Sequence, residues 1–143
     1  FVSRYDHETG NDYIVRPTPP DATTKLRFNW NAGIGQDPFN TSTVYFGSPF
    51  VHKSTDKGAS GQIISTDLTT NDSVKIKAFQ NTGGLTLDIT GAETHCSLLS
   101  IAPSAKEKGV IWVSSDDDSI LDIAKQYLQV FDTKTSASIL IDN

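Results

Sequence analysis

The sequence lacks methionine altogether and contains a single cysteine, Cys96, among its 143 residues. One cysteine cannot form an internal disulfide, and no CxxC or Cys/His cluster has the spacing of a zinc site. A natural open reading frame begins with methionine, whereas this chain begins at Phe1 with no signal-like start. We therefore expect a processed chain or a piece of a longer one.

Clustered positive charge and long apolar runs are also missing. The 12 Lys and Arg residues are scattered, and the net charge is −5. Proteins that bind nucleic acid normally carry a basic stripe, so no nucleic-acid partner is expected. No run approaches the ~18 apolar residues that a membrane-spanning helix needs. Nucleophilic triads and phosphate-binding loops are absent as well, and no cofactor is expected.

The chain does contain a series of short β-type runs. They are rich in β-branched and aromatic residues and are bounded by Gly, Pro, Asn, Asp or Ser. The predicted strands are Tyr13–Arg16, Leu26–Trp30, Thr43–Gly47, Phe50–Ser54, Gln62–Ser65, Leu85–Ile89, Cys96–Ala102, Gly109–Ser114, Leu128–Asp132 and Ser138–Asp142. Ile120–Gln129 has the apolar spacing of a helical face, with a strand as the alternative. Many short strands at even spacing predict an all-β, antiparallel fold, which could be a sandwich, a barrel or a propeller.

Two internal repeats favour the propeller among these folds. RYDHETGNDYIV (4–15) aligns without a gap with VFDTKTSASILI (130–141), and their shared aromatic-Asp-x-x-Thr order predicts a tight hairpin. GIGQDPFNTSTVYFGS (33–48) is similar to LSIAPSAKEKGVIWVSS (99–115). A chain that begins and ends on the same hairpin is expected to come from a repeating β array. In the second comparison, the matched strand residues are Val44-Tyr45-Phe46 and Val110-Ile111-Trp112.

The stretch HKSTDKGASGQII (52–64) has the residue order of a specialised β-hairpin turn. The residues that fit the Asp-box pattern S/T-x-D-x-G-x-S/T-W of sialidase-type propellers are Ser54, Asp56, Gly58 and Ser60. In that turn the Asp carboxylate accepts hydrogen bonds from backbone N–H groups, and the Gly permits a conformation closed to other residues. These residues are therefore expected to stabilise the fold rather than to catalyse. Gly61 stands where the pattern has a core-filling aromatic residue.

The resemblance to the BNR/Asp-box β-propeller proteins, which include sortilin-type VPS10 domains and xyloglucanase-like glycoside hydrolases, extends beyond this box. Residues 28–72 resemble one blade of such a propeller: FNWNAGIGQDPFNTSTVYFGSPFVHKSTDKGASGQIISTDLTTND. Residues 83–119 resemble the start of the next blade: GGLTLDITGAETHCSLLSIAPSAKEKGVIWVSSDDDS. The implied units are the tail hairpin of a preceding blade at 1–25, an Asp-box blade at 26–82 and a divergent blade at 83–143. The likeness ends after Ser119. It implies about two blades of a longer propeller, a shortened relative, or a ring closed by oligomerisation.

The densest carboxylate run is Asp116, Asp117 and Asp118, the last at a position where the family usually has Gly. Such a run could bind Ca²⁺, which takes six to eight oxygen ligands. Adjacent side chains at a strand end point to opposite faces, however, so a solvated turn is the stronger prediction and no metal site is expected.

Candidates for acid–base chemistry are few. Glu93 and His95 are two residues apart before a strand, so they would share a face and could pair for proton transfer or metal binding. For the histidine, a surface or hydrogen-bonding role is favoured. Asp88 could be one member of a glycosidase carboxylate pair, although no partner is identified in the sequence.

Together these features predict a non-catalytic binding or structural segment of an Asp-box propeller that lies outside the cytoplasm and recognises a glycan or a peptide. The alternative is part of a xyloglucanase- or sialidase-like glycoside hydrolase whose catalytic carboxylates are incomplete in this chain. A third alternative is a truncated chain without a function of its own. Its open sheet edges would be covered by copies of itself. We expect the chain to associate with copies of itself or with further propeller blades.

Overall fold

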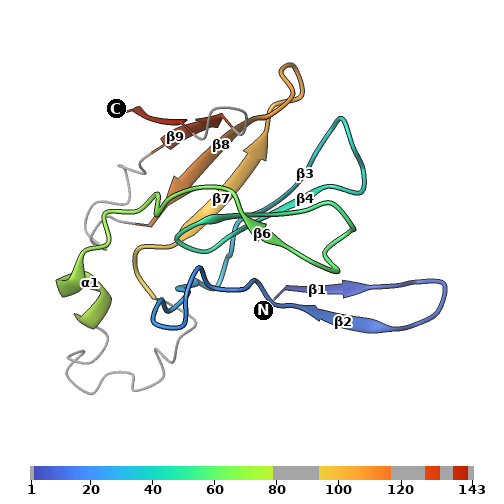
Figure 1. The fold of residues 1–143 in the computed structure, drawn as a ribbon, viewed down its shortest axis with the longest axis horizontal. Helices are drawn as coiled ribbons and strands as arrows, with labels where there is room; N and C mark the ends of the chain where they lie inside the picture. The colour runs from blue at the N-terminus through green and yellow to red at the C-terminus, as the bar shows by residue number, and fades with distance from the viewer. Residues whose placement is uncertain (1, 79–93, 117–127, 133–136, 142–143) are drawn as a thin grey trace.

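The computed structural model describes residues 2–78, 94–116, 128–132 and 137–141 (Figure 1). The N-terminal hairpin consists of β1 (Val2–Tyr5) and β2 (Asp12–Val15). The first sheet has the order β3 (Ile34–Gln36), β4 (Val44–Gly47), β5 (Val51–Ser54) and β6 (Gln62–Ile63). The second sheet has the order β7 (Leu98–Pro103), β8 (Val110–Ser115), β9 (Leu128–Asp132) and β10 (Ala137–Ile141). Every strand pair is antiparallel.

The predicted all-β, antiparallel class is confirmed, and most of the predicted strands lie within one or two residues of an observed strand. The strand expected at Leu26–Trp30 is wrong. This segment joins no ladder of the described residues; it contacts the first sheet through the ring of Phe28, which stacks on that of Phe46 with 5.7 Å between centroids. Leu85–Ile89 and most of Ile120–Gln129 lie outside the described residues, while positions 128 and 129 belong to β9.

The helix α1 (Ser73–Ala78) was not expected from the sequence. It begins directly after Asp72, whose Oδ1 accepts a hydrogen bond from the backbone N–H of Val74 at 2.8 Å. This is the usual capping of a helix N-terminus by a short acidic side chain. Within the described part of the chain, no helix is long and apolar enough to cross a membrane.

The hydrophobic core lies between the two sheets, which pack face to face where β3 and β4 contact β7 (Figure 1). Its buried members are Tyr45, Val51, Leu68, Leu98, Ile101, Ile111 and Val113. The alternation of strand side chains places Tyr45 on one face of the first sheet and Val44 and Phe46 on the other. The second sheet likewise directs Ile111 and Val113 toward the core, while Trp112 lies on its outer face.

Glycines allow the strands of the two sheets to approach closely. A Cβ atom added at Gly35 would lie 2.9 Å from the carbonyl oxygen of Ile101, and one added at Gly47 would lie 2.9 Å from the Cβ of Leu98. These distances are shorter than normal van der Waals contact, so larger residues here would push the sheets apart. The backbone N–H of Gly33 also donates to the carbonyl of Leu98 at 3.1 Å, which ties the sheets together at one edge.

The first and last hairpins have the same pairing register. In the first, Val2 pairs with Val15 and Tyr5 with Asp12. At the positions that the alignment of 4–15 with 130–141 makes equivalent, Leu128 pairs with Ile141 and Phe131 with Ser138. The gap-free correspondence expected from the sequence is therefore confirmed in the backbone. Because β9 and β10 are the outer half of the second sheet, β1 and β2 are equivalent to the outer half of such a sheet.

The second repeat also exists in the backbone, but its expected alignment is wrong by one residue in the strands β4 and β8. The pair Gly35↔Tyr45 matches Ala102↔Trp112, because both pairs enclose the same length of chain. By the same rule, Ile34↔Phe46 matches Ile101↔Val113. Tyr45 is therefore equivalent to Trp112 rather than to Ile111. This assignment agrees with the packing. Tyr45, in the first sheet, faces the second sheet, and Trp112, in the second sheet, faces away from the first, so both side chains lie on the same face of their own sheet.

Candidate functional site

The turn after β5 is held by a closed set of hydrogen bonds around Asp56. Its Oδ1 accepts from the backbone N–H of Ser60 at 2.8 Å and from the Ser54 hydroxyl at 2.7 Å, and its Oδ2 accepts from the Ser60 hydroxyl at 2.6 Å. The Ser54 oxygen in turn accepts from the N–H of Gly58 at 2.8 Å. These bonds, above all those from Ser60, hold the pKa of the Asp56 carboxyl well below its ordinary value.

Two consecutive residues of this turn, Lys57 with φ +59° and Gly58, have the left-handed backbone conformation that favours glycine. The φ of Gly58 is +86°, which residues with a side chain rarely adopt. A Cβ there would also lie 3.2 Å from a methyl group of Val15, in the N-terminal hairpin. The Asp-box turn is thus the contact point between that hairpin and the first sheet. The side chains that donate to Asp56, those of Ser54 and Ser60, belong to the turn itself. That residues 54–60 stabilise the fold rather than catalyse remains a prediction.

A cavity of about 300 Å³ opens beside this turn, between the N-terminal hairpin and the first sheet. Gly61, where the box pattern has an aromatic residue, is part of its wall. A Cβ added at Gly61, an exposed position, would meet only the carbonyl oxygen of Lys53, at 3.8 Å, so a side chain there is not obstructed at its first atom. The described side chains therefore leave the space beside Gly61 unfilled.

The lining of this cavity combines an apolar surface with positive charge. Its apolar side chains come from both components: Val2, Ile14 and Val15 from the hairpin, and Ile34, Val44 and Phe46 from the first sheet. Its ionisable side chains, apart from a histidine, are Arg4, Arg16, Lys53 and Lys57. None of the described residues in the lining carries a carboxylate. Although the chain has a net charge of −5, the charged side chains among the described lining residues are all cationic.

The histidine in the lining, His52, is not free to act as a base. Its side chain is buried, and its Nε2 is 2.7 Å from the hydroxyl oxygen of Ser48, which is buried as well. Burial lowers the pKa of His52 to about 4, so the ring is neutral at physiological pH. Because substrate cannot reach the enclosed Ser48 hydroxyl, the pair fixes the β4–β5 turn and does not supply a nucleophile. Sequence reasoning did not find this pair.

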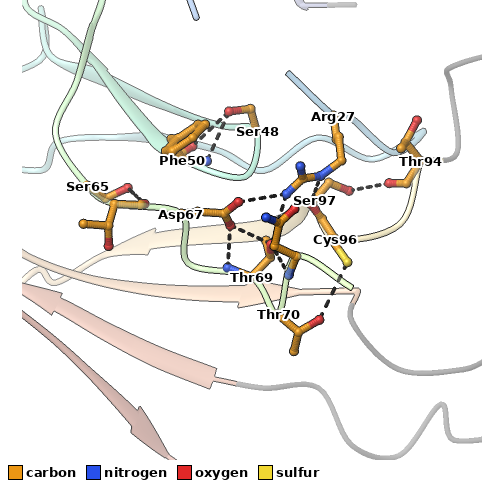
Figure 2. Close-up of polar contacts among 12 residues, drawn as sticks. Arg27, Ser48, Phe50, Ser65, Asp67, Thr69, Thr70, Thr94, Cys96 and Ser97 are labelled. Carbon is orange, nitrogen blue, oxygen red and sulfur yellow. Dashed lines mark hydrogen bonds and ion pairs between the residues drawn. The ribbon is translucent and has the colours of Figure 1, made fainter. Parts of the chain in front are cut away.

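A second polar group joins the irregular segments below the two sheets (Figure 2). Arg27 forms an ion pair with Asp67 at 2.9 Å and donates from Nε to the carbonyl oxygen of Cys96 at 3.0 Å. Asp67 also accepts from the hydroxyl of Thr69 at 2.6 Å. Figure 2 shows these side chains turned toward one another, with Thr70 beside the sulfur of Cys96. The group satisfies the guanidinium within the protein, which makes it a structural link between segments.

Asp116 differs from the solvated turn expected for the acidic run. Its Oδ1 accepts from the backbone N–H of Ser97 at 2.8 Å, and its Oδ2 accepts from the side-chain amide of Asn29 at 2.8 Å. The carboxylate is therefore used to join three segments of the chain, because it lies where the end of β8 meets residues 29 and 97. Asp117 and Asp118 lie outside the described residues.

Of the acid–base candidates, only His95 is described. Its side chain is half-buried, and its Nδ1 is buried with no hydrogen-bond partner in the described part of the chain. Glu93 and Asp88 lie outside the described residues, so the structure does not place the expected Glu93–His95 pair. Next to the histidine, Cys96 is fully buried, as expected for a small apolar residue.

The described residues contain no group of three or more His, Cys, Asp or Glu side chains that could hold a metal ion. The cavity beside the Asp-box turn is therefore the strongest candidate for a functional site. Its wall includes Gly61, the position at which the sequence departs from the Asp-box pattern. Comparisons of this chain with protein families, with curated proteins and with solved structures found no match.

Proposed function

We propose that this chain is a non-catalytic binding and structural segment of an Asp-box β-propeller located outside the cytoplasm, and that its ligand is a peptide. The observation that carries the proposal is the repeated sheet. Two four-stranded antiparallel sheets pack face to face, and the N-terminal hairpin repeats the outer half of such a sheet in the same register. Consecutive units of this kind are the building principle of propellers, whose blades bury their apolar faces against one another.

The cavity lining favours binding over glycoside hydrolysis. A glycosidase needs two carboxylates about 5–10 Å apart in a cleft. No carboxylate is found among the described residues that line this cavity, and its buried histidine is engaged with Ser48. The alternative of a partial glycoside hydrolase has no comparable observation in its support.

The same lining favours a peptide over a sugar. Carbohydrate recognition commonly uses the exposed face of an aromatic ring, but the two rings of the described lining, those of Phe46 and His52, are buried, and Phe46 already stacks on Phe28. Apolar side chains and the cations Arg16 and Lys57 suit a ligand with apolar and acidic residues instead.

An array of synthetic peptides and a glycan array, both probed with the labelled full chain, test this function. We expect binding to peptides that combine apolar and acidic residues. We also expect Gly61→Trp to remove that binding, since it fills the cavity, and Gly61→Ala to retain it. Binding to glycans alone, or peptide binding that the Gly61→Trp variant keeps in full, would contradict the proposal. Release of chromophore from aryl glycosides by the purified chain would establish the enzymatic alternative.

A further inference from the structure

Among the described residues, both outer edges of the N-terminal hairpin are open, and the edge of β1 is the one that has an equivalent with a partner elsewhere in the chain. Within the described residues β1 pairs with β2 alone, whereas the equivalent strand β9 pairs with β10 on one side and with β8 on the other. Figure 1 shows the blue hairpin extending away from both larger sheets. An unpaired strand edge is a template for a further strand. An isolated two-stranded hairpin is also marginally stable in water, which adds to the need for a partner.

The hydrogen-bonding groups on this edge follow from the turn of the hairpin. The backbone N–H of Asp6 donates to the carbonyl of Asn11 at 2.9 Å, so these two residues form a bonded pair. Bonded and non-bonded pairs alternate along an antiparallel ladder. Ser3 and Tyr5, one residue out of phase with the bonded pairs, therefore direct their N–H and C=O groups away from β2.

The second sheet shows what occupies the equivalent edge. The residues of β9 that match Ser3 and Tyr5 are Gln129 and Phe131, and they pair with Val113 and Ile111 of β8. The open edge of β1 is thus equivalent to the edge of β9 that pairs with β8, a strand of the hairpin formed by β7 and β8.

An open face lies next to this open edge. On the second sheet, Ile101 is 6% exposed because the first sheet covers it, and Tyr45 of that sheet, 2% exposed, packs in the same core. The equivalent of Ile101 on the first sheet is Ile34, which lines the cavity and is 53% exposed. The face that carries Ile34 therefore lacks the covering strands, and the missing equivalent of Tyr45 would enter the cavity.

We propose that the open edge of β1 and the cavity together form one docking site for an apolar two-stranded β-hairpin. Its inner strand would pair antiparallel with β1 and complete a four-stranded sheet. An aromatic side chain on that strand would enter the cavity against Ile34, as Tyr45 packs against the second sheet. The inference deepens the proposed peptide recognition and rests on it, since it names the shape of the peptide and the main-chain groups that bind it.

The probe that tests this site is a synthetic peptide of residues 98–115 (β7 and β8), labelled at its N-terminus and titrated into the full chain. This segment makes the required contacts within the chain itself, because β8 pairs with β9. We expect saturable binding with one peptide per chain. Trp112→Ser in the peptide should weaken binding, because Trp112 is equivalent to Tyr45 and would enter the cavity. Ile111→Ser in the peptide should weaken binding less. In the docked peptide, unlike in the chain itself, the side chain at position 111 would face away from the first sheet.

Two proline variants of the full chain form a matched pair, since Tyr5 and Asp12 are cross-strand partners. Tyr5→Pro removes an N–H that points to the open edge, whereas Asp12→Pro removes one that points away on the opposite edge. Neither residue lines the cavity. We expect about tenfold weaker peptide binding for Tyr5→Pro, the loss of roughly one hydrogen bond, and unchanged binding for Asp12→Pro. Ile34→Asp should weaken binding without any change in β1.

Equal weakening by both proline variants would show that the hairpin merely needs to be intact, and absence of binding would overturn the site outright. Concentration-dependent self-association that Tyr5→Pro abolishes, and that excludes the peptide, would assign the edge to a second copy and overturn the hairpin partner. Array peptides that still bind while the 98–115 peptide does not would refute this inference and leave the proposed peptide recognition standing. Loss of both would refute the two together.

Discussion

Replacing Gly61 by tryptophan restores the residue that the Asp-box pattern expects, and we predict that it stabilises the fold. The cavity of about 300 Å³ equals roughly ten water volumes at ~30 Å³ each, which is enough volume for an indole ring. The Gly61 backbone is outside the left-handed region, and its nearest heavy atom to an added Cβ is 3.8 Å away. The substitution therefore meets no backbone or steric barrier.

The size of the gain follows from the surface that the indole would cover. If about 100 Å² of apolar surface leaves water, the gain is ~2.5 kcal/mol at ~25 cal/mol per Å². Ordering the side chain costs ~1 kcal/mol, and loss of the glycine's freedom in the unfolded chain returns ~0.5 kcal/mol. A net gain of ~2 kcal/mol corresponds to a Tm increase of roughly 5–7 °C for a domain of this length.

Thermal unfolding followed by circular dichroism and by calorimetry measures this change. Gly61→Ala is the matched control, because it has the same effect on the unfolded chain and adds no ring. A Tm for Gly61→Trp at or below that of Gly61→Ala would refute the reasoning. It would mean that the space beside Gly61 is not the place of the missing aromatic residue.

Three further predictions concern stability. Hydrogen bonds lower the folded-state pKa of Asp56 below its ordinary 3.8, so the stabilisation is present above pH 3.8 and is lost as the pH falls below it. Acid unfolding of Asp56→Asn should therefore be less steep than that of the wild type, and a parallel curve would contradict this. The pKa of His52 falls from 6.5 to about 4 on folding, so stability should decrease as the pH drops from 6.5 toward 4, by on the order of 3 kcal/mol. Urea unfolding of His52→Gln across this pH range should show a flat profile, and an unchanged slope would refute the assignment. Gly35→Ala should cost ~1–3 kcal/mol, since its Cβ would lie 2.9 Å from a carbonyl oxygen, and a neutral result in urea unfolding would show that the sheets can separate freely.

The strands were predictable where local sequence and sheet pairing agree. Val44–Gly47 and Val110–Ser115 combine β-branched and aromatic residues with flanking turns, and both became central strands. Leu26–Trp30 has two aromatic residues but no β-branched one and joins no strand, and the ring of Phe28 stacks on that of Phe46. Composition favours an extended backbone, whereas a strand also requires a free neighbouring edge.

The candidate site was only partly visible in the sequence. The sequence showed that Gly61 stands in place of an aromatic residue but did not predict whether another side chain fills that space, and a cavity lies beside it in the structure. The cations around it come from separate elements, Arg4 and Arg16 from the N-terminal hairpin and Lys57 from the Asp-box turn. Their convergence depends on how the hairpin lies against the first sheet, and no spacing along the chain encodes that. The buried Ser48–His52 pair was missed because a histidine four residues after a serine carries no signal by itself.

The repeat relation between the sheets has a consequence for growth and symmetry. The two faces that meet in the core differ chemically: the face of the first sheet presents glycines and an aromatic residue, such as Gly35 and Tyr45, and the face of the second presents branched aliphatic side chains, such as Ile101 and Val113. Sheets stacked through these two faces all have the same orientation, so the exposed face at one end of the stack differs from the exposed face at the other end. The two exposed faces at the ends can be buried in two ways: the stack closes into a ring, so that its first sheet packs on its last, or each end is covered by a different capping element.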